Sequence, residues 1–205
     1  MRGAAFTLAE VLITLGIIGV VVIMTLTVVI DKINDLHFKN AYKKAYNDLS
    51  EVVSEAIANN EFTRQGHSNI YVREELNIFK NKFKVIKDCP FGQAFECWKD
   101  ADRFCTNSCG ANAPQSLNSS FIDASGRSWC SYSYYDSIYL VDTNGMKEPN
   151  RFGKDRWVFC FLDKDGNCTN YADKYVKVGP MRKDMKTKSV WCTYPPCNYY
   201  SWLYE

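Results

Sequence analysis

The sequence predicts an α+β protein in which a long N-terminal membrane-spanning helix continues into a head with a small antiparallel β-sheet and cysteine-rich loops. The first observation is the uncharged apolar run from Val11 to Ile30, which matches the roughly 20 residues that a helix needs to cross a bilayer. The second is a helical apolar stripe that follows this run. The third is that strand-like patterns and all nine cysteines occur only in the later part of the chain, from Cys89 onward.

The two halves of the long helix are predicted from different patterns. Between Val11 and Ile30 a helix is favoured because lipid offers no partner to an open backbone. A cleavable signal peptide is the alternative, but its apolar core is typically about 7–15 residues long, and the small-x-small site that should follow is missing here. Beyond the span, Asn59 and Asn60 predict the end of a helix whose apolar side chains recur at helical spacing: Phe38, Tyr42, Ala45, Leu49, Val52 and Ala56.

The rest of the chain reads as a short helix, a long loop and several strands. A helix is predicted over 72–83 from the spacing of its apolar residues. Residues 89–118 are rich in Cys, Ser, Asn, Gly and Pro and predict a long loop. A hairpin is predicted over 121–130, because Gly126 lies in a turn between two apolar runs. Two further strands and a turn are predicted at 137–141, 156–162 and 163–167.

Nine cysteines in the later part of the chain indicate disulfides formed in an oxidising compartment: Cys89, Cys97, Cys105, Cys109, Cys130, Cys160, Cys168, Cys192 and Cys197. The odd count leaves one thiol free or paired between subunits. Cys160 and Cys168 flank the turn at 163–167 and can face each other across a hairpin, but spacing alone does not fix the connectivity.

Two other roles for the cysteines stay open at this point. Cys105 and Cys109 could supply zinc thiolates together with Cys192 and Cys197, although neither pair has the common CxxC spacing. A nucleophilic cysteine would need a nearby base, for which His67 is the candidate away from the apolar run.

Composition argues against nucleic-acid binding and against catalysis. The formal net charge is +2, from 25 basic and 23 acidic residues, so no broad basic field is expected to attract nucleic acid. The sequence contains no Gly-rich phosphate loop and no HExxH or GxSxG motif, and it has two histidines. We therefore expect that the chain is not an enzyme.

A single carboxylate, Glu10, stands at the edge of the apolar run, where an unpaired charge is costly in lipid. The segment Ala5-Phe6-Thr7-Leu8-Ala9-Glu10-Val11-Leu12-Ile13 resembles the N-terminal motif of type IV pilins and type II secretion pseudopilins. The resemblance covers residues 1–35 and implies that prepilin peptidase cuts between Ala5 and Phe6 and methylates the Phe6 amine. It also implies that Glu10 pairs with that amine on a neighbouring subunit. The family usually has glycine before the cut, whereas here Gly3 lies two residues before Ala5.

The resemblance implies a structural subunit of a pilus-like or pseudopilus filament. Its domains would be a leader at 1–5, a transmembrane helix at 6–30, an amphipathic helix at 31–60 and a disulfide-rich head at 61–205. The implied partners are other pilin subunits, prepilin peptidase, an inner-membrane assembly platform and an assembly ATPase. The alternative function is a membrane-anchored, exported module that binds a glycan or a protein and does not polymerise.

The resemblance also implies a single-pass protein of the bacterial inner membrane whose head is exported. One pattern points the other way. The N-terminal side of the span carries Arg2, whereas Lys32, Lys39, Lys43 and Lys44 follow it, and the positive-inside rule alone would keep the later side in the cytoplasm. The prepilin motif and the cysteine-rich head favour export.

Calcium is the one candidate cofactor. Asp142, Asn144 and Asp155 offer hard oxygen ligands, in a segment, 141–157, that resembles pseudopilin heads, some of which bind calcium there. A second acidic cluster lies at 163–167. The alternative is that these side chains only shape turns by bonding their own backbone. The aromatic C-terminal tail, 191–204, is expected to pack over the sheet, and a contact surface is its alternative role.

Overall fold

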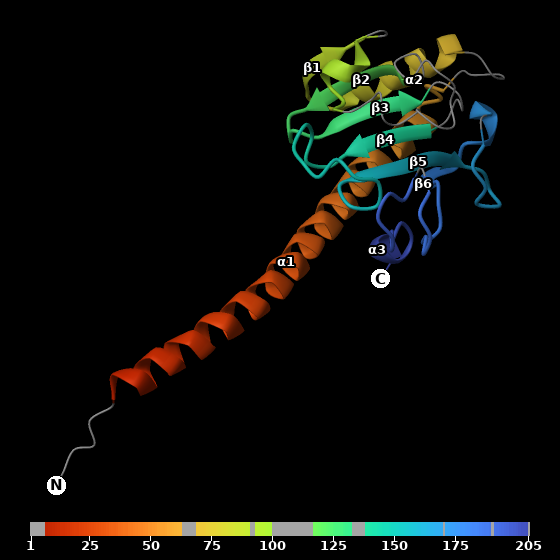
Figure 1. Ribbon diagram of the computed structural model, residues 1–205. Coiled ribbons are helices and arrows are strands. Elements are labelled where there is room, and N and C mark those ends of the chain that lie inside the picture. Colours follow the sequence, from red (N-terminus) through yellow and green to blue (C-terminus); the bar gives the residue numbers. More distant parts are fainter. Residues whose placement is uncertain are drawn as a thin grey trace. The chain divides into compact units, whose positions relative to one another are not determined.

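The computed structural model in Figure 1 describes residues 7–62, 69–90, 93–99, 117–132, 138–169, 171–189 and 191–204. The chain divides into two compact units, Met1–His37 and Phe38–Glu205. The boundary falls inside helix α1, Leu8–Ala58, which is 51 residues long. The first unit therefore consists of the apolar part of α1, and the second consists of the head together with the amphipathic part of α1.

The apolar part of α1 is a helix of the kind that crosses membranes. It is the one helix among the described residues that is long and apolar enough to do so, and the most apolar 18-residue window has a mean hydropathy of 2.8. Its large side chains are exposed, including Leu12, Ile17 and Ile23 at about 60% or more of their surface. The prediction of a helix that can span a bilayer is confirmed in length and composition.

The amphipathic part of α1 buries the predicted stripe. Tyr42, Ala45, Leu49, Val53 and Ala56 are fully buried. The helix ends where the sequence indicated, because Asn60 adopts a left-handed conformation with φ of 53°. This turn lets the Glu61 N–H donate to the Ala56 carbonyl at 2.9 Å, which satisfies a carbonyl that would otherwise lack a helical partner.

The head contains one antiparallel sheet in which each strand pairs with the next along the chain (Figure 1). Its strands are β1 (Val85–Cys89), β2 (Leu117–Asp123), β3 (Ser128–Tyr132), β4 (Ile138–Asp142), β5 (Arg156–Leu162) and β6 (Lys177–Pro180). The predicted hairpin and the strands at 137–141 and 156–162 correspond to β2 to β5. Strands β1 and β6, at the two edges, were not predicted. The predicted helix at 72–83 is α2, Asn69–Lys82.

Both helices pack on the same face of the sheet. The Tyr42 ring of α1 stacks on Trp157 of β5 with centroids 3.8 Å apart. The Phe79 ring of α2 meets Tyr139 of β4 edge-on at 4.7 Å. All four side chains are at most 1% exposed. Aromatic pairs with these geometries contribute about 0.5–1.5 kcal/mol each beyond their buried area, so this layer forms the centre of the head's core.

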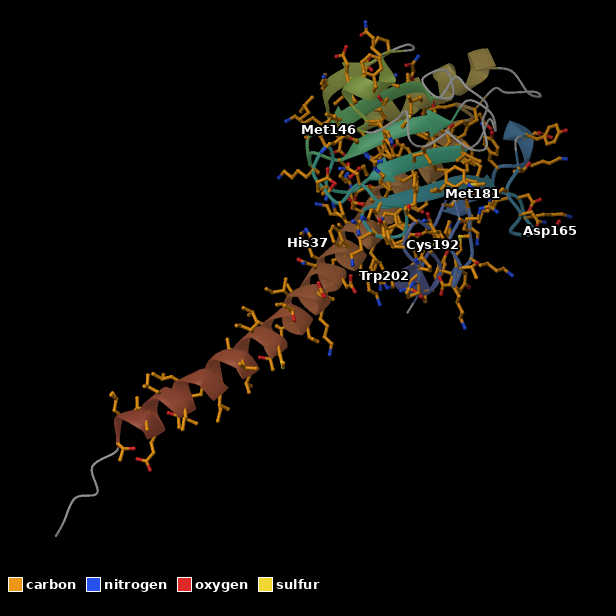
Figure 2. The ribbon with its side chains drawn as sticks, in the orientation of Figure 1. His37, Met146, Asp165, Met181, Cys192 and Trp202 are labelled. Atoms are coloured by element: carbon orange, nitrogen blue, oxygen red, sulfur yellow. A yellow bond between two sulfur atoms is a disulfide. The ribbon has the colours of Figure 1, made fainter. Side chains whose placement is uncertain are left out.

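The C-terminal tail closes this core from the side of α1. The Cys192–Cys197 disulfide closes a short loop, and after it the fully buried Tyr199 offers its carbonyl to the Tyr42 hydroxyl at 2.8 Å. Trp202, in the short helix α3 (Ser201–Tyr204), lies 5.4 Å from Trp157 between ring centroids. Figure 2 labels Cys192 and Trp202 on this tail. The expectation that the aromatic tail packs over the sheet is confirmed for these residues.

A buried charge network joins the β2–β3 hairpin to α1. Arg127 donates from Nε to the Asp123 carboxylate at 2.7 Å and from Nη1 to Asp48 of α1 at 2.6 Å. The Trp129 indole also donates to Asp123, at 2.8 Å. The Arg127 and Asp123 side chains are 7% and 3% exposed, whereas Asp48 is 34% exposed. The buried Arg127 guanidinium thus links the hairpin to the helix.

Candidate functional site

The start of α1 carries the first candidate site, and its geometry is a capping box. Thr7 precedes the first helical residue, Leu8. The Thr7 backbone N–H and its hydroxyl donate to Glu10 Oε2 at 2.9 and 2.8 Å, and the Glu10 N–H donates back to the Thr7 hydroxyl at 3.3 Å. Such reciprocal bonds satisfy donors that the first turn of a helix leaves without partners.

This arrangement gives Glu10 a partner within its own chain. Glu10 was predicted to pair between subunits, and the contact with Thr7 was not predicted, although Thr-x-x-Glu before an apolar run is the sequence signature of a capping box. Within the described residues, Glu10 Oε1 makes no hydrogen bond, so one carboxylate oxygen remains for another partner. Ala5 and Phe6, the predicted processing and methylation residues, lie outside the described residues.

The predicted calcium ligands lie at one end of the sheet, around the connection between β4 and β5. Asp142 ends β4, Asn144 follows it in a turn, and Asp155 precedes β5. Both Asp155 oxygens accept backbone N–H groups, from Asn150 at 2.7 Å and Arg151 at 2.6 Å. This matches the alternative in which acidic side chains shape turns.

Arg156 is the functional side chain of this cluster that sequence reasoning missed. It is 3% exposed and lies directly opposite Asp142 in the β4–β5 register. Its Nε donates to Asp142 Oδ2 at 2.7 Å, and its Nη2 donates to the Asn150 side-chain oxygen at 2.7 Å and to the Lys99 carbonyl at 2.6 Å. The guanidinium also lies 4.7 Å above the Trp98 ring.

These contacts do not fit a calcium ion at Asp142, Asn144 and Asp155. Calcium takes six to eight oxygens at about 2.3–2.6 Å, whereas here both oxygens of each carboxylate already accept hydrogen bonds. In the same cluster, Asn144 Oδ1 is a buried oxygen without a partner. Across the described parts of the chain, no three His, Cys, Asp or Glu side chains are grouped so that they could hold a metal ion.

The two buried carboxyls of this cluster hold protons more tightly than usual. Burial, followed by the neighbouring Asp155 carboxylate, raises the pKa of Asp142 to about 7, although Arg156 opposes the shift. Burial likewise raises the pKa of Asp155. A carboxyl whose pKa is higher in the folded chain than in the unfolded chain stabilises the fold in its protonated form.

We therefore expect the head to lose stability as the pH rises from 5 to 8. The contribution of Asp142 is complete below about pH 4, the pKa range of an unfolded aspartate, and it is lost as the pH passes through the folded pKa. The expected loss exceeds about 1 kcal/mol, since each unit of pKa shift corresponds to about 1.36 kcal/mol. Thermal unfolding in detergent, followed by near-ultraviolet circular dichroism, measures it. Asp142→Asn should remove most of the difference, and an unchanged pH profile in that variant would contradict the assignment.

Six of the cysteines that the structure describes form disulfides: Cys89–Cys97, Cys160–Cys168 and Cys192–Cys197. The pairing of Cys160 with Cys168 across the hairpin turn is confirmed. The zinc alternative is wrong for Cys192 and Cys197, because their sulfurs are bonded to each other. Its other two candidates, Cys105 and Cys109, lie outside the described residues.

Cys130, on β3, is the free cysteine of the described part of the chain and is fully buried. Burial raises the pKa of its thiol far above the usual range, so it stays protonated and unreactive at neutral pH. His67, the candidate base, lies outside the described residues. A cysteine nucleophile at Cys130 therefore has no support.

Parts of the C-terminal tail remain at the surface. Tyr194, Tyr200 and Tyr204 are each more than half exposed, and the rings of Tyr200 and Tyr204 lie 4.5 Å apart between centroids.

Comparison of the chain with protein-family models, with curated proteins and with solved structures gave no significant match.

Proposed function

We propose that this chain is a structural subunit of a type IV pilus-like or type II secretion pseudopilus filament, anchored in the bacterial inner membrane with its head exported. Prepilin peptidase would process it before Phe6, and an inner-membrane platform and an ATPase would assemble it. The observation that best supports this proposal is the structure of α1. One continuous helix has an exposed apolar half and a half whose inner face is buried in the head.

The exposed apolar half favours assembly over simple anchoring. A helix in lipid gains little from further burial of leucine or isoleucine, so close packing and polar groups determine its packing partners. Glu10 is the one charged residue between Leu8 and Ile30. A carboxylate at this depth is costly unless it is paired, and a neighbouring subunit's amine offers the stronger, charged partner. Thr7 would hold Glu10 in place until that partner arrives.

Three substitutions separate pairing between subunits from capping within the chain. Glu10→Ala removes both interactions, whereas Glu10→Gln keeps a side chain that suits a capping box but loses the charge. Thr7→Val removes the capping hydroxyl and keeps the charge. The measurement is the amount of each variant in sheared filaments relative to the membrane fraction, in cells that carry the assembly machinery.

We expect Glu10→Ala and Glu10→Gln to insert in the membrane at wild-type levels and to fall at least about tenfold in the filament fraction, as loss of a buried charge pair implies. Thr7→Val should assemble within about twofold of wild type. Normal assembly of Glu10→Gln would show that the charge is not used. Normal assembly of Glu10→Ala as well would refute the role of Glu10 in pairing between subunits, and absence of the wild-type chain from filaments would refute the filament proposal.

The mature N-terminus provides an independent check. Mass spectrometry of the membrane-extracted protein should find a chain that begins with N-methylated Phe6 and has lost five residues. An intact Met1, or a cut near residue 30, would refute processing by prepilin peptidase. If the chain is found membrane-anchored and never in filaments, its exposed tyrosines Tyr194, Tyr200 and Tyr204 favour the alternative of an anchored binding module.

A further inference from the structure

The guanidinium of Arg156 gathers oxygens from three separate segments of the head. They are the Asp142 carboxylate on β4, the Asn150 amide oxygen in the loop before β5, and the Lys99 carbonyl beyond the short helix η1, Ala94–Glu96. Carboxylate, amide and peptide oxygens are the ligand types that hard cations bind in proteins. Here all three lie 2.6–2.7 Å from nitrogens of one side chain.

The surroundings require a cation at this point. The Asp142 and Asp155 side chains bring two carboxyls into a region where their residues are 1% and 0% exposed. A buried carboxylate without a counter-charge costs several kcal/mol. The Lys99 amine pairs instead with Glu148, whose carboxylate is 68% exposed, at 2.6 Å. Arg156 is therefore the cation that the two acidic groups share.

We propose that Arg156 occupies a cation-binding niche in place of a metal ion, so that the loop from Asp142 to Asp155 is held without calcium. A calcium ion at this place would have to displace the guanidinium, because the Asp142, Asn150 and Lys99 oxygens that could bind it lie 2.6–2.7 Å from the Arg156 nitrogens. This inference concerns the head alone and does not depend on filament assembly. Its functional consequence is a head whose fold and contacts are independent of calcium outside the cell.

The test compares thermal unfolding of the full-length protein in detergent at pH 8, in EDTA and in millimolar calcium chloride. Wild type should unfold at the same temperature in both, within about 1 °C. Arg156→Gln keeps a polar side chain of similar reach but no charge. It should unfold roughly 5–10 °C lower than wild type in EDTA, as expected for a buried carboxylate that loses its partner. Calcium should restore at least half of that loss, because the vacated oxygens then hold the ion.

Arg156→Lys is the matched control, since it keeps the positive charge but not the fork of donors. It should lose less stability than Arg156→Gln and should not respond to calcium. An Arg156→Gln protein that folds only with calcium would support the proposal. The niche is refuted if calcium stabilises wild type, or if Arg156→Gln gains nothing from calcium, whether it is merely weakened or fails to fold in both conditions.

Discussion

Gly153→Ala should lower the free energy of unfolding of the head by about 2–4 kcal/mol, through two effects that add. Gly153 has a φ of +84°, a left-handed conformation that costs other residues about 1 kcal/mol or more. A methyl group there would also overlap the sulfur and the Cβ atom of Cys197. Because the Cys192–Cys197 disulfide fixes that sulfur, the neighbour cannot move aside cheaply. The melting temperature in detergent, read from near-ultraviolet circular dichroism, should fall by roughly 5–10 °C.

Gly166→Ala is the matched control for this prediction. Gly166 has nearly the same φ, +80°, but no atom lies within 4 Å of the place that its Cβ would take. Its substitution carries the conformational cost alone, about 1 kcal/mol. The difference between the two variants therefore measures the steric contact with Cys197. Equal losses would contradict the close packing of the tail against Gly153.

Arg127→Met should cost about 3–5 kcal/mol, the range seen when one partner of a buried ion pair is removed. The apolar stem would still pack, but Asp123 would keep its charge at 3% exposure with only neutral donors. The bond from Arg127 to Asp48 of α1 would be lost as well. Thermal unfolding and protease sensitivity of the β2–β3 hairpin should both register the change.

Asp48→Asn serves as the comparison, because it removes the other end of the network. Asp48 is 34% exposed, so water can replace its partner, and the expected cost is below about 1 kcal/mol. A loss as large as that of Arg127→Met would show that the stabilisation comes from the bond between Arg127 and Asp48 of α1. A smaller loss would show that most of the cost of Arg127→Met comes from leaving the buried Asp123 carboxylate without its charged partner.

The elements with strong periodicity were predictable, and the edge strands were not. The stripe from Tyr42 to Ala56 repeats every three or four residues and was found with its end at Asn60. Strand β6 is four residues long and contains Gly179 and Pro180, which oppose a strand assignment from sequence alone. Pro180 is tolerated because β6 is the last strand of the sheet, where one side needs no backbone donor.

The candidate-site residues also differ in whether the sequence could predict them. Glu10 was found because it interrupts an apolar run, and Thr7 was missed although its signal is local. The role of Arg156 could not be found in this manner, because it depends on the register that places it opposite Asp142, fourteen residues earlier. The spacing of Asp142 and Asp155 along the chain suggested a metal ion. The pairing of β4 with β5 shows that the cation beside Asp142 is the Arg156 guanidinium.

The packing of the tail on Trp157 and Tyr42 also sets an order of events during biosynthesis. The Trp157 ring contacts Tyr199 and Trp202, and the Tyr42 hydroxyl donates to the Tyr199 carbonyl, so these contacts form only after α1 and the sheet have been synthesised. Until the tail has been synthesised, this apolar side of the nascent head stays exposed to solvent. A chain truncated before Cys192 is therefore expected to expose Trp157 and to be cleaved by proteases more readily than the full-length chain.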